Sequence, residues 1–305
     1  MDANNERRDL KGTLVPFSIV INGGATIIFN AYGALKQSNL SGIWSHKSVN
    51  SYYGTSAGAI LSVILALQYE WEEIDDFLIK RPWQNVWKFN VLNIYDYYLK
   101  KGIYGIEIFH DIFGPLFKGK DLDISVTLKE FYEATGKTIY IYAVKLSTFD
   151  IVEFSHKTHP DMKVLDAVHA SSALPILFKP AEYNGELYTD GGFLINYPLA
   201  KCTEDPATIL AVQNIYNESN TNINEVNGLF EYLSYLLNMV TSKNQCIPTV
   251  KPGYEILLNT GFIDYTSIFK LANSPEEREA LIKKGAEDAI ACLSELVDSA
   301  KLPPL

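Results

Sequence analysis

The pentapeptide Gly54-Thr55-Ser56-Ala57-Gly58 constrains the fold of this chain more than any other segment. It follows a β-prone segment, residues 49–53, and opens a helix-forming segment, residues 57–67. A serine in that position is expected on a sharp strand-to-helix turn with its hydroxyl exposed. Gly54 and Gly58 suit such a turn because side chains there would clash with the helix or a ligand. The helix N-terminus adds free N–H groups and the positive end of a dipole, so Ser56 is a candidate nucleophile. The alternative is a glycine-rich turn that carries an unreactive serine.

Strand-like and helix-like segments alternate along most of the chain. Strands are predicted over residues 17–21, 49–53, 138–145, 208–213 and 254–258, and helices over 27–37, 57–67, 71–80, 106–113, 127–134, 164–172, 229–241 and 275–299. This alternation predicts an α/β fold in which helices cover both faces of a mainly parallel sheet. The last helix is expected to pack on the sheet through an apolar stripe made of Ala280, Ile282, Ala286, Ala289, Ile290 and Leu293.

Length and composition fit one large domain. A chain of 305 residues can form one large α/β domain or two small ones, and 47% hydrophobic residues suffice for a substantial core. No Gly/Ser-rich or Pro-rich linker interrupts the motif region, so we predict a tail over residues 1–14 and a single domain over 15–305. The motifs occupy about residues 17–200, and residues 201–305 form a C-terminal extension of helices and strands. Within that extension, the polar segment 217–227 is expected to join a strand to a helix.

The base that would activate Ser56 is not evident from the histidines. Such a serine usually works with a histidine held by an acid, and in α/β-hydrolases that histidine comes last. Here no histidine follows His169, which lies in a helix-like segment and is expected to be an ordinary, partly buried imidazole. His46, His110 and His156 carry no motif, and His159 would need an unusual arrangement. Asp190 is the alternative base, in the segment Tyr188-Thr189-Asp190-Gly191-Gly192, although Asp-Gly-Gly taken alone favours a simple turn.

The segments around Asp190 carry a family resemblance. Ala170-Ser171-Ser172-Ala173-Leu174-Pro175 precedes the aspartate, and Asn196-Tyr197-Pro198 follows it. Together with Gly-x-Ser-x-Gly and Asp-Gly-Gly, in this order, they resemble the patatin-like phospholipase family from about residue 19 to residue 198. The resemblance implies a three-layer α/β/α fold and a catalytic dyad of Ser56 and Asp190 without histidine, metal or cofactor. The glycines that would support the dyad are Gly54, Gly58, Gly191 and Gly192.

The resemblance also implies an oxyanion loop after the first strand. Family members carry a run similar to Gly-Gly-Gly-x-Arg/Lys-Gly just after that strand. At this place the chain has Asn22-Gly23-Gly24-Ala25-Thr26-Ile27-Ile28. The third glycine, the basic residue and the last glycine are thus replaced by Ala25, Ile27 and Ile28. The N–H groups of Gly23, Gly24 and Ala25 are the expected oxyanion donors, and each such donor is worth roughly 3–4 kcal/mol in related hydrolases. A structural glycine turn is the alternative interpretation.

Three functions are compatible with these motifs. The resemblance implies a lipid acyl hydrolase in which Asp190 takes the proton of Ser56, and Ser56 attacks an ester carbonyl of a phospholipid or other acyl-glycerol. Water then releases the fatty acid from acyl-Ser56. Such a carboxylate base needs a partly desolvated site that raises its pKa. The altered glycine loop instead favours a catalytically silent protein that binds lipids or other partners, and a general esterase or thioesterase would use the same dyad.

The net charge and the cysteine content limit the kinds of partner and the cellular compartment that we expect for this protein. The net charge of −10 argues against nucleic acid and against purely electrostatic attachment to anionic membranes. Three widely spaced cysteines predict neither a disulfide framework nor a metal site and fit a reducing compartment. The N-terminus is charged and no apolar run is long enough to span a bilayer. We therefore expect a cytoplasmic protein that contacts membrane surfaces transiently.

Residues 77–104 are the candidate for that membrane contact. Aromatic and basic residues are interleaved there, a combination that suits a membrane interface. The alternative is that the aromatic side chains belong to the core and the lysines face solvent, since most large apolar side chains are buried. The residues concerned are Trp83, Trp87, Phe89, Tyr95, Tyr97, Tyr98 and Tyr104, with Lys80, Arg81, Lys88, Lys100 and Lys101.

Overall fold

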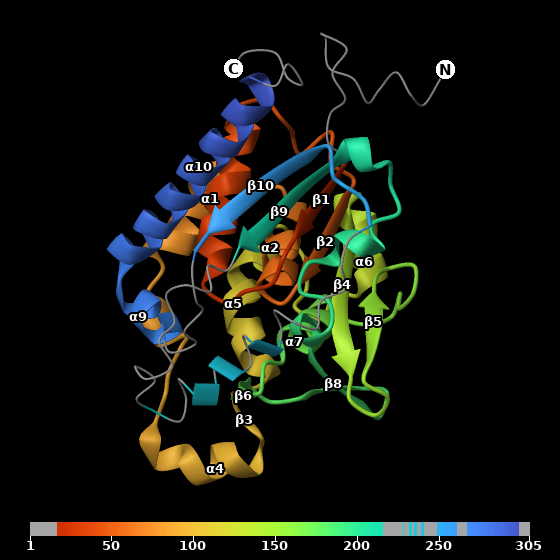
Figure 1. The fold of residues 1–305 in the computed structure, drawn as a ribbon. Helices are drawn as coiled ribbons and strands as arrows, with labels where there is room; N and C mark the ends of the chain where they lie inside the picture. The colour runs from red at the N-terminus through yellow and green to blue at the C-terminus, as the bar shows by residue number, and fades with distance from the viewer. Residues whose placement is uncertain are drawn as a thin grey trace.

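The computed structural model describes residues 17–215, 249–260 and 267–298, together with Gly228 and residues 232–233, 235–236 and 239–240. The predicted tail over residues 1–14, the polar segment 217–227 and most of the helix predicted over 229–241 lie outside these residues. A mixed sheet with the strand order β10-β9-β1-β2-β4-β8-β7 forms the centre of the molecule, and β5 pairs with β4 (Figure 1). The strands of this sheet are β1 (Ser18–Ile21), β2 (Ser51–Thr55), β4 (Thr138–Lys145), β5 (Asp150–Phe154), β7 (Ala181–Tyr183), β8 (Glu186–Asp190), β9 (Ile209–Ile215) and β10 (Tyr254–Asn259).

The middle of the sheet is parallel and its far edge is antiparallel. Strands β10, β9, β1, β2 and β4 all run in one direction. Strands β5 and β8 run antiparallel to β4, and β7 runs antiparallel to β8. Parallel strands are normally covered on both faces, and every residue of β1 and β2 is indeed buried. The predicted α/β class and the mainly parallel sheet are therefore confirmed.

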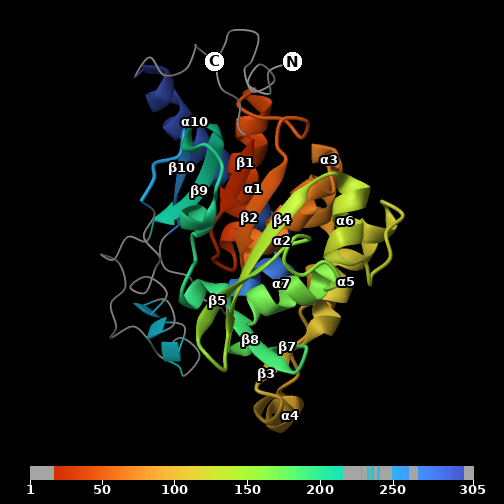
Figure 2. The same cartoon turned by 90° about the vertical axis from the view of Figure 1, so that its right-hand side faces the viewer.

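The two faces of the sheet are covered unequally (Figure 2). One face, with Ile19 and Ile21 of β1, packs against the helices. The opposite face, with Val20 and Tyr53, packs against a segment around Ile195 that includes a 3-10 helix, Pro198–Lys201. Among the described residues, the second outer layer is therefore a short segment in place of long helices. The helical layer contains α1 (Ile27–Leu40), α2 (Ala57–Ala66), α3 (Trp71–Asp75), α5 (Ile106–Lys118), α6 (Leu128–Thr135), α7 (Val164–Ser172), α9 (Ser267–Asn273) and α10 (Pro275–Asp298).

Helices α1 and α10 pack with their backbones in contact. A Cβ atom on Gly33 would lie 1.9 Å from the carbonyl oxygen of Ile282, and one on Gly285 would lie 1.9 Å from that of Asn30. Helix α10 also packs on β10, as predicted for the last helix. The predicted apolar stripe is partly wrong, because Ala280 and Ile290 are exposed. The buried side of α10 is centred on the glycine that permits the close crossing and includes Arg278, Gly285, Ala289 and Leu293.

A projection leaves the body of the molecule between α3 and α5 (Figure 1). The helix predicted over residues 71–80 ends at Asp75 and continues as a π-helical turn, Asp76–Lys80. Two 3-10 turns, Trp83–Asn85 and Val91–Asn93, then lead to the short helix α4 (Ile94–Leu99). The chain returns along β3 (Gly102–Tyr104), which pairs with β6 (Ile176–Phe178) in a separate two-stranded sheet. No described helix is long and apolar enough to cross a membrane.

Candidate active site

Ser56 lies on the turn between β2 and α2, where the backbone conformation is unusual. Its φ and ψ angles are 54° and −121°, a conformation that glycine tolerates and that costs other residues about 1–3 kcal/mol. A long-range hydrogen bond fixes the turn, since the N–H of Ser56 donates to Ser171 Oγ at 2.9 Å. Ser171 Oγ in turn donates to the carbonyl oxygen of Tyr142 at 2.6 Å. The strand-to-helix turn predicted at Ser56 is therefore present, and α7 holds it in place.

Two motif glycines let the backbones approach one another at this turn. A Cβ atom on Gly54 would lie 2.4 Å from the carbonyl oxygen of Gly58, and one on Gly58 would lie 2.3 Å from that of Ile21. Neither distance leaves room for a side chain. Helix α2 can therefore begin directly against the end of β1 because both positions are glycine. This packing brings the loop that follows β1 next to Ser56.

The register of the sheet brings Asp190 to Ser56, although 134 residues separate them. Along β4, Tyr142 lies opposite Thr55 of β2, and the next residue, Ala143, lies opposite Asp190 of β8. Strand β5 occupies the other edge of β4 along residues 141–145, so β2 and β8 meet end to end on the same side of β4 and bring Ser56 next to Asp190. Ser56 Oγ donates to Asp190 Oδ2 at 2.6 Å, the short distance typical of a hydroxyl bound to a carboxylate.

Asp190 is buried and has only neutral hydrogen-bond donors around it. The residue is only 4% exposed. Its Oδ1 accepts a hydrogen bond from the N–H of Gly192 at 2.7 Å. Burial raises the pKa of Asp190 to about 6, while the hydrogen bonds from Ser56 and Gly192 oppose the rise. A carboxylate of this pKa is mostly ionised at neutral pH and is a stronger base than an exposed aspartate. Gly191 completes the turn, because a Cβ atom there would lie 2.3 Å from the carbonyl oxygen of Tyr142.

The glycine loop after β1 borders Ser56, but one predicted oxyanion donor is already engaged. The N–H of Gly23 donates to the carbonyl oxygen of Asn196 at 2.9 Å, which contradicts its predicted role as a donor to an oxyanion. Gly23 instead allows close packing, since a Cβ atom there would lie 3.2 Å from Ser56 Cβ. The N–H groups of Gly24 and Ala25 have no hydrogen-bond partner among the described residues. Both residues line the pocket beside Ser56 and remain available as donors.

None of the five histidines, all of which lie in the described part of the chain, hydrogen-bonds to Ser56 or Asp190. His169 Nε2 lies 3.0 Å from the carbonyl oxygen of Lys179, and its ring packs on Phe109. Burial lowers the pKa of His169 to about 4, so it is a neutral imidazole in the core, as predicted. The described residues also contain no group of three His, Cys, Asp or Glu side chains arranged as metal ligands.

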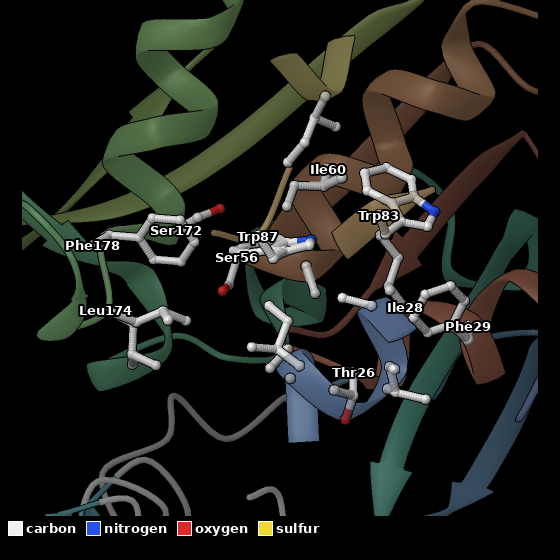
Figure 3. A pocket seen from close by; sticks show the side chains of 18 of the residues that line it. Thr26, Ile28, Phe29, Ser56, Ile60, Trp83, Trp87, Ser172, Leu174 and Phe178 are labelled. Atoms are coloured by element: carbon white, nitrogen blue, oxygen red, sulfur yellow. The ribbon is translucent and has the colours of Figure 1, made fainter. Parts of the chain in front are cut away.

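Ser56 faces an apolar pocket of about 130 Å³ (Figure 3). In the close-up, Ile28 and Phe29 come from α1, Ile60 from α2, and Leu174 and Phe178 lie on the side of α7 and β6. Such a lining, with a few polar groups at one place, is typical of a site for an apolar ligand. The aromatic residues predicted for membrane contact are divided here: Trp83 and Tyr104 are buried and Trp87 lines the pocket, whereas Phe89, Tyr95 and Tyr98 are exposed.

Two further polar residues in the pocket wall did not emerge from the sequence. Ser172 is 2% exposed, and its hydroxyl has no hydrogen-bond partner among the described residues. The close-up places its hydroxyl at the same cavity as Ser56 (Figure 3). Arg278 is 1% exposed and donates to the carbonyl oxygens of Arg81 and Ala272, among others, so it ties α10 to the pocket wall. The Ala-Ser-x-Ala segment could have indicated Ser171 and Ser172, but no sequence pattern indicates the direction of Arg278.

A comparison with known families identifies the class of protein to which the chain belongs. The family model described as patatin-like phospholipase matches residues 19–202 of this chain. Because the match covers more than half of the sequence, the chain belongs to the patatin-like phospholipase family.

The chain is also similar to individual proteins of known sequence or structure. The chain is 26% identical over 277 residues to "Probable lipid hydrolase 463L" of Invertebrate iridescent virus 6, which covers 88% of this chain and 89% of the relative. It is 24% identical over 188 residues to "Uncharacterized protein R571" of Acanthamoeba polyphaga mimivirus, 62% of each protein. Among solved structures, VipD from Legionella pneumophila is similar with a TM-score of 0.56 and 16% identity, over 94% of this chain and 69% of VipD. At that identity the structural similarity concerns the fold alone.

Proposed function

We propose that this protein hydrolyses carboxylic esters of phospholipids or other acyl-glycerols, with Ser56 as nucleophile and Asp190 as general base. The observation that carries the proposal is the 2.6 Å hydrogen bond from Ser56 Oγ to Asp190 Oδ2, at the wall of an apolar pocket. Membership of the patatin-like phospholipase family supports the class of substrate. The similarity to a viral protein named as a probable lipid hydrolase supports it as well.

The proposed reaction proceeds in two steps. Asp190 accepts the proton of Ser56 Oγ while the oxygen attacks the ester carbonyl, and the alkoxide of the glycerol leaves with that proton. This step forms the acyl-Ser56 ester. Asp190 then accepts a proton from water, the hydroxide attacks the acyl carbonyl, and Ser56 recovers its proton as the fatty acid leaves. The Gly192 N–H keeps Asp190 oriented in both steps, because it occupies the other carboxylate oxygen.

The developing oxyanion would be stabilised by the N–H groups of Gly24 and Ala25. Both groups are free of other hydrogen bonds within the described residues, and Ala25 has a positive φ of 40° that turns the loop at this point. The positions equivalent to the family's basic residue and last glycine are Ile27 and Ile28. These substitutions are the one feature that favours a catalytically silent lipid-binding protein.

The proposal is tested by hydrolysis of a fluorogenic phospholipid and a short-chain nitrophenyl ester. Ser56→Ala and Asp190→Asn should each lower turnover by at least about 10³-fold. Asp166→Asn is the matched control, since Asp166 is a partly buried aspartate of α7 that does not line the pocket. Turnover of the nitrophenyl ester alone would indicate a general esterase. Folded wild-type protein that hydrolyses neither substrate would refute the proposed activity.

A further inference from the structure

The projection around α4 ends in a cluster of apolar side chains that are largely exposed within the part of the chain that the structure describes. We call residues 89–99 the α4 tip. Leu92 is 86% exposed, Tyr98 78% and Tyr95 70%, the highest values among the large hydrophobic residues of the described chain. Val91, Ile94 and Leu99 are all more than half exposed as well. An exposed apolar group of this size on a protruding element is typical of an interaction site.

Charge distinguishes the α4 tip from the rest of the surface. Lys88 precedes it and Lys100 and Lys101 follow it, so lysines flank the tip on both sides. Asp96 is the acidic residue within it and forms an exposed ion pair with Lys100 at 2.8 Å. Residues 88–101, the tip with its flanking lysines, contain three lysines and one aspartate and are therefore net positive, in a chain whose net charge is −10. Exposed aliphatic residues and tyrosines flanked in the sequence by lysines form a combination that suits a bilayer surface.

The α4 tip is joined directly to the wall of the candidate active site. The chain returns from the tip along β3, which pairs with β6, and Phe178 of β6 lines the pocket. Trp87, at the start of the projection, packs edge-on against both Tyr104 of β3 and Phe178, with ring centroids 5.2 Å and 6.1 Å away. Trp87 lines the same pocket as Ser56. Trp87 and β3 therefore connect the tip to the wall of the pocket that Ser56 faces.

We propose that the α4 tip inserts into the surface of an anionic phospholipid bilayer and places the mouth of the pocket on the membrane. The aliphatic side chains enter the acyl region, Tyr95 and Tyr98 lie at the headgroups, and the flanking lysines contact lipid phosphates. This inference rests on the proposed function for its substrate, but the binding step itself requires no hydrolysis. It can therefore be measured in a protein that lacks the nucleophile.

The test is co-sedimentation with vesicles of phosphatidylcholine, with and without phosphatidylserine, in a Ser56→Ala background. Replacing Leu92 and Ile94 by serine should weaken vesicle binding by at least about tenfold per side chain, the loss expected when a buried aliphatic group is removed. Leu40→Ser is the matched control, because Leu40 is 62% exposed at the C-terminal end of α1 and does not belong to the tip. Binding should also fall when phosphatidylserine is omitted or when Lys100 and Lys101 are changed to glutamate.

Several outcomes would overturn the inference. Vesicle binding that is absent in the parent protein, or unchanged by the Leu92 and Ile94 substitutions, would do so. A concentration-dependent dimer that only the tip substitutions dissociate would show that a second copy of the chain covers the tip. The same variants, with Ser56 intact, should hydrolyse a soluble short-chain ester as fast as the wild type. Loss of that activity in Ser56→Ala alone tests the proposed function, so the two failures are distinguishable.

Discussion

Replacing Asp190 by asparagine should stabilise the folded protein while it abolishes the proposed activity. The Asp190 carboxylate is 4% exposed and its described partners are the hydroxyl of Ser56 and the N–H of Gly192, so no cation compensates its charge. Burial raises its pKa from 3.8 to about 6. Ionising this group therefore costs more free energy in the folded protein than in the unfolded chain. Asparagine has the same shape, is neutral and can still accept the N–H of Gly192.

The pKa shift sets the size of the effect and its dependence on pH. A rise of about two pKa units corresponds to about 3 kcal/mol of lost stability once the group is ionised in both states. Because the folded-state pKa is the higher one, this loss is absent below about pH 4, grows between about pH 4 and 6, and is constant above that range. Asp190→Asn should thus raise the free energy of unfolding by about 3 kcal/mol near pH 8, and by roughly half of that near pH 5.

The assay is urea unfolding of wild type and Asp190→Asn at the two pH values, supported by thermal unfolding. The gain near pH 8 corresponds to a rise in Tm of about 5 °C. Ser56→Ala is the control, because it removes a hydrogen bond that favours the ionised carboxylate and should not stabilise the protein. Equal free energies of unfolding of wild type and Asp190→Asn near pH 8 would refute the reasoning. A difference between these two proteins that does not shrink toward pH 5 would refute it as well.

Four further predictions follow from the same geometry. Ser56→Gly and Ser56→Ala should both be inactive, but the glycine variant should be more stable by about 1 kcal/mol in urea unfolding, since glycine tolerates the φ of 54°. Ser171→Ala should lower the free energy of unfolding by about 1–3 kcal/mol because the N–H of Ser56 loses its acceptor. Ser172→Ala loses no hydrogen bond, so this variant should unfold at the same or a higher urea concentration than the wild type. The kcat/KM for a soluble ester should fall about tenfold per pH unit below about pH 6, because Asp190 must be ionised to act as base; a pH profile that is flat down to about pH 4 would contradict this role. Gly285→Ala should lower the free energy of unfolding by about 2–3 kcal/mol, because its methyl group would overlap the backbone of α1, and an unchanged Tm would contradict that contact.

Local sequence signals were sufficient for two elements whose residues are nearly all buried. The strand over 138–145 and the helix over 164–172 agree with β4 and α7 at both ends, and both are rich in apolar residues. Strand β5 was missed because one of its residues is exposed and three are half-buried, so it has no marked pattern. The close crossing of α1 and α10 was missed for another reason. The central residue of this crossing on α10 is Gly285. A glycine adds nothing to a hydrophobic pattern, and the need for it becomes evident only when the backbone of α1 is seen against it.

In the candidate site, too, local motifs predict some features, whereas others depend on residues far away in the sequence. Motifs indicated Ser56 and Asp190, whose contact then follows from the register of β2 and β8 along β4. The N–H of Gly23 is hydrogen-bonded to the carbonyl oxygen of Asn196, and 173 residues separate the two along the chain. No local pattern reports a partner at that distance. The aromatic segment gave a mixed result, because a single stretch of sequence supplies both the pocket wall at Trp83 and the exposed α4 tip.

The position of β1 in the sheet has a consequence for how the protein is made. Strand β1, from the beginning of the chain, lies between β2 and β9, and β9 ends at Ile215. The hydrogen bonds that hold Ser56 reach across 115 and 134 residues. Pairings of such long range form slowly during folding, and a chain emerging from the ribosome exposes its serine long before the aspartate is synthesised. In the proposed mechanism, Ser56 would therefore gain its general base only after Asp190 has been synthesised and the sheet has formed around β1.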